Sequence, residues 1–150
     1  MIGMSGGATI DDAEARTTPD AMIRFILLAG GLIALGACSD SCTNTVVSRK
    51  DAPLGKYTAV MFERNCGAST GFSTQISVLD IGHEPSGGGN TFRADDDHGV
   101  AFAADWGGPW AETRWLAPDH LLIRYAAGSR LFARVDKVAG VKVSYQQVSR

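Results

Sequence analysis

From Asn44 to the C-terminus, apolar residues recur at about every second position, which is the period of a β-strand rather than a helix. Short segments containing Gly or Pro separate these runs, as in an antiparallel meander. The sequence therefore predicts an all-β fold of about seven to nine strands, either a small antiparallel meander or a sandwich- or barrel-like sheet. The expected strands are Thr45–Ser48, Tyr57–Phe62, Thr74–Ile81, Asn90–Arg93, Val100–Ala103, Ala111–Leu116, Leu121–Tyr125, Leu131–Val135 and Val141–Tyr145.

A different pattern precedes this region: thirteen uncharged residues, Phe25–Ala37, follow the single cation Arg24. A membrane-spanning helix needs about 20 apolar residues, so this run is too short to favour a transmembrane anchor. A cation, a short apolar stretch and small residues at its end are the order of a secretory signal peptide. We therefore expect a signal-peptide helix ahead of the β domain.

Four residues at the end of this run, Leu35-Gly36-Ala37-Cys38, resemble the lipobox of bacterial lipoproteins. The resemblance implies cleavage before Cys38, acylation of its thiol by chains such as palmitate, and attachment to the membrane by that lipid. Two or more long acyl chains hold a protein on a bilayer effectively permanently. The alternatives are an ordinary signal peptide with an incidental cysteine, or a short uncleaved anchor.

The chain thus divides into three segments. Residues 1–21 contain four acidic side chains and one Arg, whereas the first part of a signal peptide is positive. We predict that residues 1–21 are a disordered leader or follow a mis-assigned start, since Met22 begins a conventional signal. Residues 22–37 are the expected lipoprotein signal peptide, and residues 38–150 a single lipid-anchored β domain.

The charge of the expected mature domain excludes some partners. Without Arg16 and Arg24, twelve of the 14 Lys and Arg residues remain; without the four acidic residues of the leader, twelve of the 16 Asp and Glu remain. The net charge is then zero, which gives no footprint for nucleic acid. We expect no nucleic-acid partner.

The three cysteines fit an exported protein. If Cys38 carries lipid, Cys42 and Cys66 remain, and an even pair outside the cytoplasm predicts one disulfide bond. Two thiols without a second pair or a nearby His do not make a zinc site. Residues 62–75 also resemble a segment of small bacterial proteins, often lipoproteins, that pair a Gly-Lys-Tyr strand with a Cys-Gly turn; this resemblance supports the disulfide and implies no activity.

Candidate chemistry is sparse. Asp95-Asp96-Asp97-His98 is acidic, but successive residues of an extended chain point in opposite directions, whereas calcium loops place ligands at every second residue. The chain has three His residues but lacks the Gly-x-Ser-x-Gly elbow of many hydrolases. We predict no catalytic residues, no metal site and no cofactor, and we expect a protein that is not an enzyme.

Loops that contain glycine offer the expected recognition surface. Residues 83–89 are predicted to be a mobile loop, because they end in three consecutive glycines and glycine loses the most backbone entropy on ordering. Trp106, Trp110 and Arg130 lie in or beside other glycine-bearing loops, where burial is not required. We predict that these three side chains bind a partner; the alternative is that the two Trp residues only cover the edge of a sheet.

These observations favour a lipid-anchored protein of the bacterial cell envelope that acts as a binding or structural module. It would face the periplasm, with an envelope protein as a possible partner. Ser39 after the lipidated cysteine favours the outer membrane by analogy with other lipoproteins, although Asp40 weakens that analogy. The alternative function is inhibition of a wall-degrading enzyme, because residues 127–131 are similar to the Ser-Gly-Ala-Arg-Tyr loop of membrane-bound lysozyme inhibitors, without the Tyr.

Overall fold

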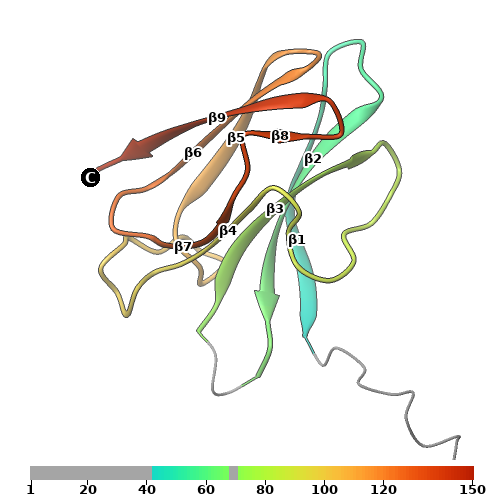
Figure 1. Cartoon of the computed structure of the whole chain (residues 1–150). Helices are drawn as coiled ribbons and strands as arrows, with labels where there is room; N and C mark the ends of the chain where they lie inside the picture. Colours follow the sequence, from blue (N-terminus) through green and yellow to red (C-terminus); the bar gives the residue numbers. More distant parts are fainter. Residues whose placement is uncertain (1–41, 68–70) are drawn as a thin grey trace, which may run out of the picture. The chain divides into compact units, whose positions relative to one another are not determined.

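The computed structural model describes residues 42–67 and 71–150, and in these residues it contains nine strands and no helix (Figure 1). The predicted all-β class is therefore confirmed. The expected signal helix and Cys38 lie outside the described residues. No helix in the described part is long and apolar enough to cross a membrane. The strands are β1 (Thr43–Asp51), β2 (Tyr57–Asn65), β3 (Ser73–Asp80), β4 (Phe92–Asp95), β5 (Ala111–Ala117), β6 (His120–Ala126), β7 (Arg130–Arg134), β8 (Lys137–Val138) and β9 (Val141–Val148).

The strands form two sheets. One has five strands in the order β1-β2-β3-β4-β7, and the other has four in the order β5-β6-β9-β8. Strands β1 to β4 follow one another as an antiparallel meander, as the sequence predicted. The second half of the chain does not continue that pattern, because β6 pairs with β9 in parallel.

The parallel pairing arises because the chain changes sheets after β6. Strand β7 pairs with β4 at the edge of the five-stranded sheet, and the chain then returns through β8 to place β9 beside β6. The tight connection through Gly128 links β6 to β7, but these strands belong to different sheets. A glycine turn in the sequence therefore predicts a tight connection but not whether its two strands pair in one sheet.

The two sheets share one hydrophobic core. Met61, Ile76 and Phe92 form a row across β2, β3 and β4 because their Cα atoms are register partners. From the opposite sheet, Ile123 and Tyr125 point into the same cluster. The rings of Phe92 and Tyr125 lie 5.2 Å apart, centroid to centroid, and join the sheets directly. Full burial of such a side chain contributes about 1.5–3 kcal/mol, so these rows hold the sandwich together.

Two strand predictions were wrong. Val100–Ala103 is not a strand: the segment turns, and only Ala103 makes an isolated bridge, to Pro109. The two-residue strand Lys137–Val138 was not predicted, because a segment this short carries no detectable alternation. Both errors lie in short connections, where the backbone follows its tertiary surroundings.

The disulfide prediction is confirmed. Cys42 and Cys66 are bonded, with a sequence separation of 24 residues. The bond ties the start of β1 to the end of β2, where Thr43 and Asn65 are register partners. It therefore closes the open end of the first hairpin.

Candidate functional site

The outer face of the five-stranded sheet, which points away from the core, is covered in the middle by residues 81–91, here called the Gly loop. In β2, Met61 belongs to the core and its neighbours Val60 and Phe62 point outward, because successive strand residues alternate. Both outward side chains are nevertheless fully buried. Their register partners on β3 are Ser77 and Gln75, which hydrogen-bond the Gly loop. The loop therefore acts as a lid over this part of the sheet.

Side chains of the sheet hold the Gly loop at several points. The N–H of Gly89 donates to Gln75 Oε1 at 2.7 Å, and the N–H of Asn90 donates to Ser77 Oγ at 3.1 Å. From β1, Asn44 Nδ2 donates to the carbonyl of Gly87 at 2.9 Å. The segment predicted as a mobile loop is thus pinned to the sheet by hydrogen bonds.

Glycine at position 89 permits this close approach. A Cβ atom there would lie 2.7 Å from the carbonyl oxygen of Phe92 and 2.9 Å from that of Ile76. Real Cβ atoms do not come so close to backbone, so no side chain fits between the loop and the sheet. Gly89 therefore serves packing, whereas Gly87 adopts a φ of +65° with open space around it.

Beside the Gly loop, the outer face contains a hollow of about 460 Å³, here called the arginine hollow. Register explains how it forms: Arg64, Ser73, Asp95 and Arg130 are successive partners across β2, β3, β4 and β7. Partners across a sheet point to the same face, so all four side chains of this row, from Arg64 to Arg130, lie on one surface. The side chains that define the hollow here are Arg64, Gln75, Arg93, Asp95, Arg130 and Phe132.

Two of the three arginines are held by neighbours. Arg64 is only 8% exposed, and its Nη1 donates to Asn44 Oδ1 at 2.6 Å and to the carbonyl of Gly87 at 2.9 Å. Arg130 makes a two-pronged ion pair with Asp95, and its Nη1 lies 3.7 Å from Asp97 Oδ1. The hydrogen bond with Asp95 raises the pKa of Arg130.

Arg93 differs from both. Its Cα partner on β3 is Gln75, so it lies in the next row of the same face, and its side chain is exposed. In the described part of the chain, no hydrogen bond or ion pair involves its guanidinium group. Phe132, at the edge of the hollow, is 56% exposed and packs under Arg130, with 5.3 Å between the ring centroid and Cζ. The hollow therefore combines the exposed guanidinium group of Arg93 with the exposed aromatic ring of Phe132.

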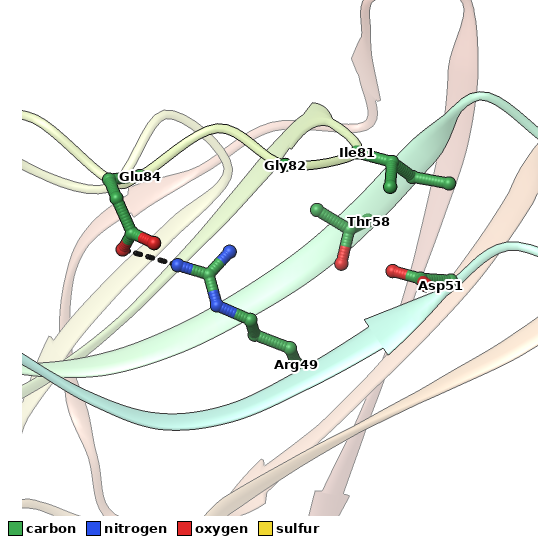
Figure 2. A pocket seen from close by; sticks show the side chains of 6 residues that line it. All are labelled: Arg49, Asp51, Thr58, Ile81, Gly82 and Glu84. Carbon is green, nitrogen blue, oxygen red and sulfur yellow. Dashed lines mark hydrogen bonds and ion pairs between the residues drawn. The ribbon is translucent and has the colours of Figure 1, made fainter.

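A smaller hollow of about 320 Å³ lies at the other end of the outer face (Figure 2). Arg49 and Glu84 form an ion pair along one side, and Asp51 and Thr58 lie on the other. Thr58 Oγ1 is buried and has no hydrogen-bond partner among the described residues. Its accessible surface is below 1 Å², so a ligand in the hollow has almost no contact with it.

The structure does not bring the three predicted recognition residues together. Arg130 lines the arginine hollow, whereas neither Trp does. Trp106 packs against the core and donates from Nε1 to Thr74 Oγ1 at 2.9 Å. Trp110 is half-buried and stacks on Phe102 with 5.7 Å between ring centroids. Whether these side chains bind a partner stays a prediction.

The arginine hollow was missed by sequence reasoning except for Arg130. Arg64 and Arg93 lie in different strands, and only the register places them on one face. In residues 127–131, which are similar to an inhibitor loop, Ser129 Oγ donates to the carbonyl of Ala126 at 2.7 Å within its own turn. That hydroxyl is already used by the turn.

The acidic run beside the hollow is also occupied by internal contacts. Asp95 and Asp97 both face Arg130, and Asp95 Oδ1 also accepts from the N–H of Asp97 at 3.0 Å. Within residues 42–67 and 71–150, no three His, Cys, Asp or Glu side chains are grouped so as to hold a metal ion. The run thus serves to orient Arg130.

No family model matches this chain, and neither a curated protein nor a solved structure matches it.

Proposed function

We propose that this protein is a lipid-anchored binding module of the bacterial cell envelope, held on the periplasmic side of the membrane through Cys38. The observation that carries the proposal is the cysteine pairing. The chain has three cysteines, and Cys42 is bonded to Cys66, which leaves Cys38 over at the end of the apolar run. A disulfide also fits an oxidising compartment. A lipid anchor needs one free thiol, and Cys38 is the cysteine that the disulfide does not use.

The rest of the domain is suited to binding rather than catalysis. The sandwich carries the arginine hollow on one face and, on another segment, Trp110, which contacts the ring of Phe102 and the guanidinium group of Arg124. Arg and Trp side chains are the residues on which binding energy concentrates at interfaces. An envelope protein is the partner we favour for Trp110.

Mass spectrometry of the protein extracted from bacterial membranes tests the anchor. We expect an N-terminus at Cys38 carrying a diacylglyceryl group, and a Cys38→Ser variant that lacks both the cleavage and the lipid. Recovery of an intact N-terminus beginning at Met22 from the same membranes would refute lipidation at Cys38.

Crosslinking in intact cells tests the binding role. We expect Trp110→Ala to reduce the yield of a crosslinked envelope protein, while the matched control Arg114→Ala, an exposed residue on β5, leaves the yield unchanged. A lysozyme activity assay run in parallel distinguishes the inhibitor alternative. Equal crosslinking by both variants would exclude Trp110 as the contact.

A further inference from the structure

The arginine hollow is connected through the disulfide bond to the part of the chain near Cys38, the proposed attachment point of the lipid. Cys66 lines the hollow and is bonded to Cys42. Only four peptide steps separate Cys42 from Cys38, which is at most about 14 Å of extended chain. If Cys38 carries the lipid, as proposed above, the hollow lies within reach of the membrane surface.

We infer that the arginine hollow binds the phosphate group of an anionic lipid headgroup and so orients the domain on the membrane. The inference rests on the proposed anchor for its choice of lipid over a soluble ligand. The site itself rests on the side chains: Arg93 presents a guanidinium group without a partner in the described structure, and Arg130 is fixed beside it by Asp95.

Guanidinium groups suit this ligand because their planar N–H donors match the oxygens of phosphate. Three of the four formally charged side chains lining the hollow are Arg, and Asp95 is the fourth. Arg130 is paired with Asp95 and Arg64 donates to Asn44 and Gly87, so Arg93 is the side chain left to bind the anion. Binding there requires no existing ion pair to break.

Phe132 completes the site. A Phe ring that is 56% exposed at the edge of a cationic hollow is suited to the boundary between headgroups and acyl chains, where Trp, Phe and Leu side chains of membrane-surface segments are buried. A soluble phosphate ligand would leave that ring in water. The aromatic ring and the nearby attachment point together favour a lipid over free phosphate.

Modification of arginine by phenylglyoxal, read residue by residue by mass spectrometry, tests this in the full lipidated protein. The protein is placed in phosphatidylcholine vesicles, in vesicles containing phosphatidylglycerol, and in phosphatidylcholine vesicles with added inorganic phosphate. We expect phosphatidylglycerol to slow modification of Arg93 roughly tenfold, about the worth of one charge-assisted hydrogen bond. Arg114, exposed on β5 and likewise unpaired in the described structure, is the internal control and should react at one rate throughout.

Protection by inorganic phosphate as strong as that by phosphatidylglycerol would overturn the lipid in favour of a soluble ligand. Equal rates for Arg93 in all three preparations would overturn the site. A second measurement separates the site from the anchor: binding of short-chain phosphatidylglycerol to detergent-solubilised protein, which does not depend on lipidation. There we expect Arg93→Gln to weaken binding roughly tenfold and Arg114→Gln to have no effect.

Discussion

Gln75 in β3 accepts a 2.7 Å hydrogen bond from the backbone N–H of Gly89, and this contact fixes the Gly loop over the outer face of the sheet. The glycine also approaches the backbone of Ile76, next to Gln75, more closely than any side chain would allow. Val60 and Phe62 are buried on this outer face as fully as the residues of the core. The loop thus covers a second buried apolar layer of the sheet, which lies between the two hollows.

Replacement of Gly89 tests this role. Gly89→Ala should destabilise the protein by about 1–3 kcal/mol, because the new Cβ would overlap the carbonyl oxygens of Phe92 and Ile76 and push the loop outward. Urea unfolding measures the loss. The matched control is Gly71→Ala, where a Cβ would meet nothing within 4 Å. Equal midpoints for the two variants would show that the loop is not packed as described.

The disulfide leads to a second prediction. Cys66→Ala should lower the free energy of unfolding by about 3.5 kcal/mol under oxidising conditions, since the bond closes a loop of 24 residues' separation in the unfolded chain. Thermal unfolding with and without reductant measures this. Reductant should lower the melting temperature of the wild-type protein but not that of the variant. An unchanged melting temperature for Cys66→Ala would contradict the expected contribution.

Much of the fold could be predicted from the sequence, and particular residues show why. Ile76 and Val78 are separated by the polar Ser77, so the period of two predicted β3, whereas the continuous apolar run Ala59–Phe62 predicted β2. The parallel pairing of β6 with β9 could not be predicted, because alternation identifies a strand but not its partner. The hydrogen bonds of the Gly loop could not be predicted either, because they form only when the loop folds back over β3, where Gln75 and Ser77 lie.

The candidate site was harder to predict for the same reason. Arg130 follows a glycine turn, which is a local signal in the sequence. Arg64 and Arg93 carry no such signal: they join the hollow through the row from β2 to β7 and through pairing with Gln75. A site built across four strands becomes visible only when the register is known.

The turn between β1 and β2 contains a strained residue. Leu54 has a φ of +53°, a conformation that favours glycine, and its side chain is fully exposed at 106%. The N–H of Gly55 donates to the carbonyl of Ala52 at 3.1 Å, so Leu54 is the third residue of the turn. A non-glycine residue in this conformation costs about 1–2 kcal/mol.

Leu54→Gly should therefore stabilise the protein by about 0.5–1 kcal/mol, because relief of the strain exceeds the extra entropy that glycine loses on folding. No side-chain contact is lost in the exchange. The matched control Leu54→Ala keeps the strained backbone and should leave stability nearly unchanged. Urea unfolding compares the three proteins, and destabilisation by Leu54→Gly would show that the leucine side chain makes a contact.

Two buried threonines lead to opposite expectations. Thr113 Oγ1 is buried without a hydrogen-bond partner among the described residues, so Thr113→Val should stabilise the protein by about 1 kcal/mol. Thr74 is equally buried, but its hydroxyl donates to the carbonyl of Pro109 at 2.6 Å and accepts from Trp106. Thr74→Val should therefore lower the free energy of unfolding by about 1–3 kcal/mol. Calorimetry of both variants checks the pair, and the same sign for both would contradict the assignment of partners.

Tyr145 gives the fold a dependence on alkaline pH. Its hydroxyl donates to the carbonyl of Val135 at 2.6 Å, and burial raises its pKa from 10.0 to about 12. The folded state thus favours the neutral phenol, so this contribution to stability is complete below about pH 10 and is lost as the pH rises towards about 12.

Tyr145→Phe should lower stability at pH 7 by about 1 kcal/mol, through loss of the hydrogen bond to Val135. It should also remove part of the decline in stability between about pH 10 and 12, because the group that titrates there is gone. Urea unfolding of both proteins across this range measures the difference. The two curves should approach each other as the pH rises; a constant separation would show that Tyr145 titrates alike in the folded and unfolded chains.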